Sequence, residues 1–469
     1  RAAARDRAAL PGTAYALDAL AATALPFDDG LATELRLFET LSRSPVARAF
    51  RYRFLAERRA GRVQPSTRLA DVTSAAVIGG GTMGRGIALA LLAGGLAVTV
   101  VETARERADA ATAAVRAELD RAVTKGRLDP DVRDAQVSRL RGDVGLQQLG
   151  DADLVIEAVF EDLAVKQAVF AEADRYAKPG ALLASNTSSL DLDAIASATR
   201  RPADVVGLHF FSPAHVMRLV EIVEGAATSP DTLARAARLT RRLSKIGVVA
   251  RVGDGFIGNR LMDQYVRQAM ALLQRGVTPD RVDAALEAWG MAMGPFRALD
   301  LVGNDIPWQA RRARGAAGPE WHLADQLAER GWLGRKSGSG WYSYAPPTPT
   351  LDPRVGDLVA GWSGVPNGRA AISDDEIVER CIYALVNEAA AVMQDGIAVR
   401  ASDIDVVFLN GYGFPGARGG PLFYADQLGL DQVLRAMRRF EGDFWSPAPL
   451  LTEYADRGWS ITTWERPAR

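Results

Sequence analysis

Cysteine and histidine are rare in this 469-residue sequence, which has one cysteine, Cys381, and three histidines. A single cysteine excludes an intramolecular disulfide and a cysteine-based zinc cluster, and three histidines leave little for a histidine-rich metal site. Net charge is also lacking, because 56 Lys and Arg oppose 57 Asp and Glu, for a formal charge of −1. We therefore expect no metal, no nucleic-acid partner, no anionic membrane surface and a reducing, cytoplasmic location.

Long apolar runs are missing as well. None reaches the roughly 20 residues of a membrane-spanning helix, so we expect no membrane anchor. The composition, 48% hydrophobic and 24% charged, is typical of a globular protein. The length suggests about three folding units. The sequence begins with Arg1 and not with Met, so we interpret it as a fragment or a processed chain.

Residues 1–66 have a helical pattern and no core of their own. The apolar residues Leu31, Leu35, Phe38 and Leu41 recur at steps of four and three, as they do along one face of a helix. A basic and aromatic stretch follows. We predict a helical arm or linker here.

From residue 75 onward, β-like runs alternate with helical stretches. The runs are AAVIG at 75–79, AVTVVE at 97–102, DLVIEA at 153–158, ALLA at 181–184, VVGL at 205–208, and further runs at 220–223 and 248–252. This alternation predicts an α/β fold, a doubly wound Rossmann-type sheet over residues 71–253.

Beyond this domain, helical periodicity dominates and one segment occurs twice. The alignment of 259–283 with 379–405 places Arg260 opposite Arg380, Gly276 opposite Gly396 and, after a two-residue insertion, Asp283 opposite Asp405; LDLVG at 299–303 then meets ADQLG at 425–429. The repeat predicts two tandem all-helical domains, at 254–345 and at 346–469, that bury faces against each other.

A glycine cluster lies between the first β run and a helix. Gly79 permits a tight turn, Gly81 lets backbone approach a pyrophosphate, and Gly84 allows close packing of helix on strand. Thr82 and Met83 complete this cofactor loop at the helix N-terminus, which is suited to an anion. Glu102, 18 residues past Gly84 at the next strand end, favours ribose hydroxyls over a 2′-phosphate, so we predict NAD. The alternatives are an ordinary glycine-rich turn and a solvated strand end.

Several linked motifs resemble the L-3-hydroxyacyl-CoA dehydrogenase family. They are SNTSSL at 185–190, GLHFFSP at 207–213, LVEIV at 219–223, DGFIGNRL at 254–261, MGPF at 293–296, GRKSGSGWYSY at 334–344 and NGYGFPGARGGP at 410–421. The doubled helical region resembles the dehydrogenase part of multifunctional fatty-acid β-oxidation enzymes, in which an enoyl-CoA hydratase domain precedes it. Residues 1–66 resemble the end of that domain, so we expect most of the hydratase to be absent. One departure is Gly80, where the family often has Ala.

The resemblance implies a catalytic set: His209 as acid/base, Glu221 as its partner, and Ser188 and Asn259 in contact with the substrate. Oxidation of an alcohol needs a group that takes the hydroxyl proton, and histidine titrates in the useful range. A carboxylate can hold the imidazole in one tautomer. The alternatives are a core histidine, an outward strand residue, and helix-capping roles for Ser188 and Asn259.

The resemblance also implies that Glu161, Lys166 and Asn186 line the nicotinamide and its ribose. The alternative for Glu161 and Lys166 is the first turn and solvated face of a helix. His215 and His322 have no assigned role, and Cys381 is interpreted as a small apolar filler.

The implied function is reversible NAD-dependent oxidation of a (3S)-3-hydroxyacyl-CoA to a 3-oxoacyl-CoA, in fatty-acid β-oxidation. Three alternatives stay open: a dehydrogenase of a short free hydroxy acid or another CoA-like substrate, a non-catalytic NAD-binding or structural protein, and a chain that works only with a hydratase part in a multifunctional assembly. The second helical copy could replace a dimer contact, which favours a monomer over a homodimer. The sequence does not reveal acyl chain-length preference.

Overall fold

The computed structural model describes residues 11–63, 71–313, 315, 318–345, 348–365, 371–440 and 446–466. Parts of the predicted segments 1–66 and 346–469 thus lie outside the described residues. The chain divides into two compact units. The sheet unit comprises Leu55–Asn259, Asp395–Gly411 and Glu465–Arg469, and the helical unit comprises Arg1–Phe54, Arg260–Gln394 and Tyr412–Trp464.

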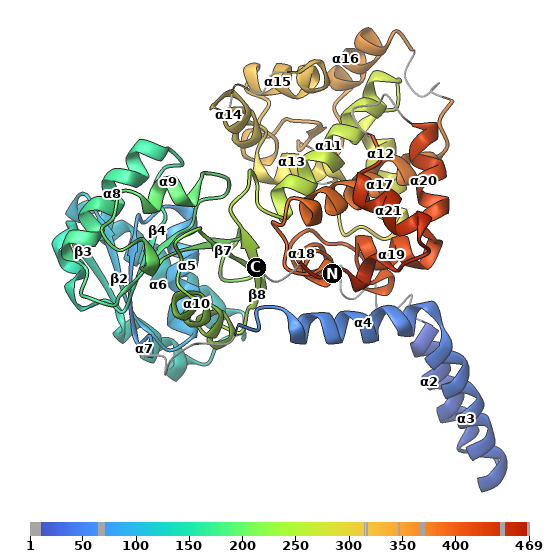
Figure 1. Cartoon of the computed structure of the whole chain (residues 1–469), viewed down its shortest axis with the longest axis horizontal. Coiled ribbons are helices and arrows are strands. Elements are labelled where there is room, and N and C mark those ends of the chain that lie inside the picture. The colour runs from blue at the N-terminus through green and yellow to red at the C-terminus, as the bar shows by residue number, and fades with distance from the viewer. Residues whose placement is uncertain are drawn as a thin grey trace. The chain divides into compact units, whose positions relative to one another are not determined.

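The sheet unit is built on one sheet of eight strands in the order β3-β2-β1-β4-β5-β6-β7-β8 (Figure 1). The strands are β1 Ser74–Ile78, β2 Ala97–Glu102, β3 Leu140–Val144, β4 Leu154–Glu157, β5 Leu182–Ser185, β6 Val205–Phe210, β7 Leu219–Glu224 and β8 Ile246–Arg251. Neighbouring strands are parallel except β6 and β7, which are antiparallel. The strand order reverses between β1 and β4, where doubly wound folds bind their ligands.

Helices cover this sheet on both sides, with α8 and α9 above the strands and α7 and α10 below them in Figure 1. The helices are α5 Thr82–Ala93, α6 Arg105–Thr124, α7 Pro130–Ser138, α8 Leu163–Tyr176, α9 Leu192–Ala196 and α10 Pro230–Arg242. Side-chain caps start several of them; for example, Asp162 accepts the amide of Val165 at α8, and Ser229 accepts that of Thr232 at α10. Strands β4, β6 and β7 are almost continuously buried, as expected of a sheet covered on two faces.

The sequence patterns missed β3. Its residues, LRGDV, contain two charges and a glycine, and only Leu140 is fully buried. A strand that lies at the sheet edge and pairs only with β2 needs no apolar run.

Part of the second helical copy belongs to the sheet unit. Helix α18, Ala401–Gly411, packs on β7 and β8. The segment before it lies along the edge strand, where the Arg251 amide donates to the Ile397 carbonyl at 2.8 Å and Ala250 bridges Ala398. This contact covers backbone groups that a bare edge strand would expose.

The helical unit contains the rest of both copies. The first has α11 Gly258–Gln274 (from Arg260), α12 Pro279–Trp289, α13 Pro295–Val302, α14 Asp305–Ala313 and α15 His322–Glu329; the second has α16 Pro353–Ser363, α17 Asp374–Gln394, α19 Pro421–Leu428, α20 Leu430–Arg439 and α21 Pro449–Asp456. A short two-stranded sheet joins β9, Tyr342–Ser343, to β10, Thr350–Leu351. Helix α17 packs on α12, α19, α20 and α21 and so joins the two copies.

One aspartate in each helical copy accepts backbone amides from the segment that ends the copy. Asp300 on α13 accepts the amides of Trp341 and Tyr342, each at 3.0 Å. Asp426 on α19 accepts the amides of Ile461 and Thr462 at 2.9 and 3.0 Å. The predicted alignment of LDLVG with ADQLG places these two residues opposite each other.

The N-terminal segment forms three helices, α2 Pro11–Ala22, α3 Phe27–Arg43 and α4 Pro45–Arg59. Helix α3 is amphipathic, yet none of its residues is buried. Its apolar stripe, including Leu35 and Phe38, is exposed. The helical prediction for this part is thus confirmed over the described residues.

Within the described residues, no helix combines the length and the apolar character needed to cross a membrane. The same residues contain no group of three or more His, Cys, Asp or Glu side chains that could hold a metal ion. The predicted fold class, a doubly wound sheet followed by helical domains, is confirmed.

Candidate active site

The predicted acid/base pair lies on two neighbouring strands. His209 on β6 and Glu221 on β7 are directly opposite each other in the antiparallel register. Their side chains point to the same face, and His209 Nδ1 lies 2.7 Å from Glu221 Oε2. Glu221 is fully buried and His209 is 6% exposed. The twelve-residue spacing therefore corresponds to a cross-strand pair.

Backbone amides hold the second oxygen of Glu221. The amides of Ile257 and Gly258, where α11 begins, donate to Oε1 at 3.1 and 2.9 Å. Because these partners are donors, the carboxylate is ionised and suited to accept a hydrogen bond from Nδ1–H. We therefore assign the proton of the neutral imidazole to Nδ1, which leaves the lone pair of Nε2 for chemistry.

Two aromatic rings flank His209. The ring of Phe211 lies 4.5 Å from the imidazole and that of Phe256 lies 5.9 Å from it, measured between ring centres. Phe256 is buried and has a positive φ of 50°, which is uncommon for a residue with a side chain. Its conformation turns the chain so that the next two amides meet Glu221. Sequence reasoning missed Phe256, because no pattern reveals a backbone angle.

The three glycines of the cofactor loop have different surroundings. A Cβ on Gly79 (φ 99°) would lie 2.7 Å from the Ala158 carbonyl oxygen, and one on Gly84 would lie 1.8 Å from the Gly79 carbonyl oxygen. A Cβ on Gly81 would meet no atom within 4 Å. Gly79 and Gly84 are therefore needed for the fold of the loop. Gly81 leaves its backbone open to a ligand.

This open glycine is the N-cap of α5, whose first turn contains Thr82, Met83 and Gly84. First-turn amides have no acceptor inside a helix, so they can bind an anion. The fit to a dinucleotide pyrophosphate thus rests on open backbone and unused donors in one place.

Glu102 lies beside this loop at the end of β2. Its Oε1 accepts the amide of Gly80 at 2.6 Å and its Oε2 accepts that of Thr103 at 3.2 Å. A Cβ on Gly80 would lie 2.5 Å from the Cβ of Ala111, so glycine here matches the close packing of α6. A carboxylate that is fixed beside this loop can accept hydrogen bonds from ribose hydroxyls and would repel a 2′-phosphate.

The other predicted residues form a second cluster. Glu161 Oε1 accepts the amide and the hydroxyl of Ser188 at 2.7 and 3.1 Å, and its Oε2 lies 3.1 Å from Lys166 Nζ. Asn259 Nδ2 donates to the Ser188 carbonyl at 3.1 Å. Asn186 Oδ1 accepts the amide of Phe210, next to His209. The structure thus brings Glu161, Lys166, Ser188 and Asn259 together, and it ties Asn186 to the strand that contains His209.

The capping and solvated-face alternatives do not describe Ser188, Glu161 or Lys166, whereas Asn259 does lie in the first turn of α11. The caps of α9 and α8 are Asp191 and Asp162, and not Ser188 or Glu161. Lys166 is 1% exposed and is not on a solvated face. Burial alone would raise the pKa of Glu161, but Lys166 and hydrogen bonds from Thr187 and Ser188 hold this pKa below its usual value.

Lys166 also contacts Glu157, a residue that sequence reasoning missed. Its Nζ lies 2.6 Å from Glu157 Oε1, and both side chains are 1% exposed. In the sequence, Glu157 is the charged residue near the end of the β-like run DLVIEA. A charge inside a buried strand could have indicated a functional residue.

A doubly wound sheet with an open glycine at its strand-order reversal, a fixed acid at the end of β2 and a buried His–Glu pair defines an NAD-dependent dehydrogenase. The comparisons with known proteins agree. Residues 74–254 match the family of the 3-hydroxyacyl-CoA dehydrogenase NAD-binding domain, and residues 255–344 and 377–461 match its C-terminal domain. The chain therefore belongs to the 3-hydroxyacyl-CoA dehydrogenase family, and the double match confirms the predicted repeat.

Named relatives agree with this assignment. The chain is 39% identical over 479 residues to the peroxisomal bifunctional enzyme of Danio rerio, covering 94% of this chain and 65% of the relative. The 3-hydroxybutyryl-CoA dehydrogenase of Escherichia coli has a TM-score of 0.71 at 27% identity, over 83% of this chain and 99% of that one. The dehydrogenase part of multifunctional enzyme 1 from C. elegans has a TM-score of 0.63 at 26% identity, over 86% and 96%.

The chain spans just under two thirds of the length of the zebrafish relative, and 61% of the human peroxisomal bifunctional enzyme. The family matches and the solved relatives confirm the predicted family, NAD as the cofactor, and the class of enzyme.

Proposed function

We propose that this chain catalyses the reversible NAD-dependent oxidation of a (3S)-3-hydroxyacyl-CoA to a 3-oxoacyl-CoA. The observation that carries the proposal is the buried contact of 2.7 Å between His209 and Glu221. This pair can take and return one proton, as the interconversion of an alcohol and a ketone requires.

In the oxidative direction, His209 Nε2 accepts the proton of the substrate 3-hydroxyl. Bound NAD⁺ supplies the acceptor for the hydride that leaves C3. Glu221 holds Nδ1–H and stabilises the imidazolium that forms. In the reductive direction, the imidazolium returns the proton to the carbonyl oxygen.

Ser188 and Asn259 are proposed to donate hydrogen bonds to the substrate oxygen. In the structure the Ser188 hydroxyl donates to Glu161, so substrate binding would exchange that acceptor for the substrate. The amide of Asn259 already contacts Ser188, which places both groups together.

For the cofactor, we propose that Gly79, Gly81, Thr82, Met83 and Gly84 bind the pyrophosphate. Glu102 would accept hydrogen bonds from the adenine-side ribose. Glu161, Lys166 and Asn186 would line the nicotinamide and its ribose. The open backbone at Gly81 and the amide-bound Glu102 support this arrangement.

The first test is the loss of NADH absorbance when acetoacetyl-CoA is added to purified protein. We expect turnover with NADH, much less with NADPH, and a loss of about 10²- to 10⁴-fold in kcat for His209→Ala. His322→Ala is a matched control, because His322 lies in the helical unit and contacts Gln326 and Trp362. Free 3-oxo acids in place of the thioester would reveal a free-acid enzyme.

If NADH binds but no 3-oxoacyl-CoA is reduced, the non-catalytic alternative replaces the proposal.

We further propose that a hydratase partner acts before this chain. The relatives are named bifunctional, and the apolar face of α3 is exposed although the helix is amphipathic. The test is a coupled assay with a trans-2-enoyl-CoA and NAD⁺. We expect NADH only after a separate enoyl-CoA hydratase is added; NADH without it would contradict this proposal.

The location and the oligomeric state stay predictions. The first relatives are named peroxisomal, whereas the proposal for this chain is the cytoplasm. A monomer is proposed because the second helical copy already packs on the first. Light scattering of the purified chain tests this.

A further inference from the structure

One buried lysine serves two carboxylates at the end of β4. Lys166 Nζ lies 2.6 Å from Glu157 Oε1 and 3.1 Å from Glu161 Oε2. Lys166 and Glu157 are each 1% exposed. Two acids therefore share a single ammonium group.

Both acids are surrounded by donors. Glu157 Oε1 accepts the Val159 amide at 2.7 Å, and its Oε2 accepts the Ser185 hydroxyl at 2.7 Å. Glu161 accepts the Thr187 hydroxyl and the Ser188 amide, both at 2.7 Å. These four partners all donate, which matches an ionised carboxylate, because such a group can only accept hydrogen bonds. With one cation and two anions, the three side chains sum to a charge of −1.

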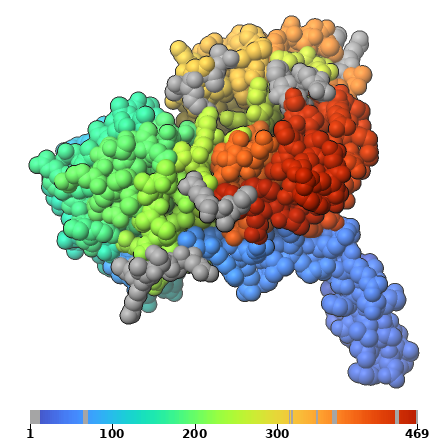
Figure 2. Space-filling view, viewed as in Figure 1, coloured from blue at the N-terminus to red at the C-terminus, as the bar shows by residue number. Residues whose placement is uncertain are grey.

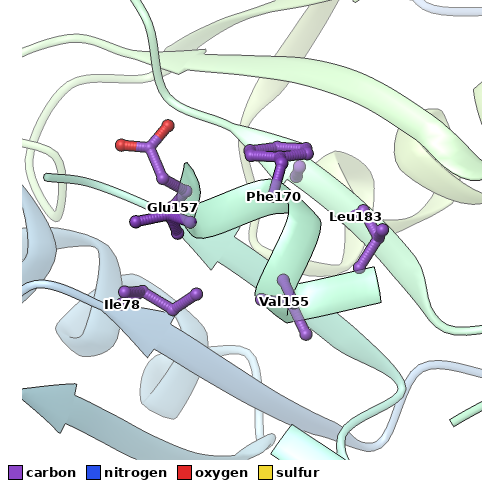
Figure 3. Close-up of a pocket in the computed structure, with 8 residues that line it drawn as sticks. Ile78, Val155, Glu157, Phe170 and Leu183 are labelled. Carbon is purple, nitrogen blue, oxygen red and sulfur yellow. The ribbon is translucent and has the colours of Figure 1, made fainter. Parts of the chain in front are cut away.

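Apolar side chains lie behind this charge. Figure 3 shows the carboxylate of Glu157 turned away from Ile78, Val155, Phe170 and Leu183, which line a small pocket with it. A surrounding of low polarity screens a charge much less than water does, so the charge acts over a longer distance.

The charge lies at the cofactor edge of the sheet. Glu157 is the last residue of β4 and pairs in register with Ile78, the last residue of β1. The glycine loop starts at the next residue, Gly79. Glu161 follows four residues later and contacts Ser188.

We propose that this uncompensated negative charge makes the chain bind NAD⁺ more tightly, relative to NADH, than a neutral site would. The inference rests on the proposed function, which places the nicotinamide near Glu161. The oxidised ring carries a positive charge and the reduced ring is neutral, so a fixed anion stabilises only the oxidised form. NADH gains nothing from this charge, so the charge shifts the balance of binding toward NAD⁺. Glu157 acts as a positioning residue through Lys166 and Glu161.

The test is calorimetric titration of the full chain with NAD⁺ and with NADH. In Glu157→Gln the trio becomes neutral, and we expect the ratio Kd(NAD⁺)/Kd(NADH) to rise roughly three- to tenfold. Ser185→Ala is the matched control, because it removes a hydrogen bond from the same carboxylate and leaves the charge unchanged. In this control the two dissociation constants should change together.

An equal weakening of both dinucleotides in Glu157→Gln would show a merely structural role and would overturn the inference. Circular dichroism checks that the variant folds. If it does not fold, Glu161→Gln also makes the trio neutral, by removing the charge of the partly exposed acid. This variant must then raise the ratio Kd(NAD⁺)/Kd(NADH). If the unaltered chain binds neither dinucleotide, the proposed function itself fails; if it binds both and neither variant moves the ratio, only the inference fails.

Discussion

Buried carboxylates occur in both units of this chain, but their partners differ. In the sheet unit, Glu221 contacts the His209 imidazole and Glu157 contacts the Lys166 ammonium group. In the helical unit, Asp300 holds the backbone amides of Trp341 and Tyr342, and its other partners are the neutral side chains of Asn304 and Tyr344. A buried acid beside an imidazole or an ammonium group can move or bias a charge, whereas one with backbone amides and neutral side chains as partners holds a chain segment in place. Burial alone does not reveal which role an acid has.

The largest effect is expected from Glu221→Gln, which tests the role of the buried acid in the sheet unit. The amide cannot accept Nδ1–H of His209 and both backbone amides as the carboxylate does, so we expect kcat to fall about 10²- to 10⁴-fold. The free energy of unfolding should change far less than the rate does. Steady-state kinetics and urea unfolding of one preparation measure both. A variant with normal kcat would remove Glu221 from the mechanism.

Asp300→Asn should show the opposite profile. One carboxylate oxygen that accepts an amide is replaced by an NH₂ group, which leaves a buried donor without its acceptor. We expect the free energy of unfolding to fall by about 2–3 kcal/mol, with kcat little changed. Asp426→Asn is the matched variant in the second copy, and it should lose less because Asp426 is only partly buried. Equal losses, or a lost kcat in either variant, would contradict the comparison.

The most gradual effect is expected from a pH titration of Asp283. Burial raises the pKa of this carboxyl from 3.8 to about 7, despite hydrogen bonds from Tyr342, Phe296 and Arg297. The folded chain keeps this proton up to a higher pH than the unfolded chain, so stability from this group falls as pH rises between these two values. The slope is at most about 1.4 kcal/mol per pH unit.

Unfolding midpoints of the unaltered chain and of Asp283→Asn, compared across this range, measure that contribution. The variant should lose stability less steeply with rising pH. Parallel curves would show that Asp283 does not titrate there.

Much of the fold could be predicted from the sequence. Seven of the eight strands coincide with β-like runs, and the repeat places Asp300 opposite Asp426, which have the same role. Strand β3 was missed because an edge strand with two charges lacks the apolar signal. The glycine loop was predictable because strand, turn and helix follow one another directly in the chain.

The site was harder to predict in full. The pairing of His209 with Glu221 follows from local sequence once two strands are expected. The roles of Phe256 and Glu157 do not follow from the sequence. The role of Phe256 depends on a backbone angle, and that of Glu157 depends on a lysine nine residues later. Such contacts arise from tertiary packing, which a linear pattern does not order.

The antiparallel pairing of β6 and β7 has a consequence for how this family can change over time. His209 and Glu221 are in register, and a shift of one residue would turn Glu221 to the other face of the sheet. A change in the length of the connection between Phe210 and Leu219 leaves this register intact, but Phe211 at its start contacts His209. Within either strand, the loss or gain of one residue would separate His209 from Glu221 and end catalysis.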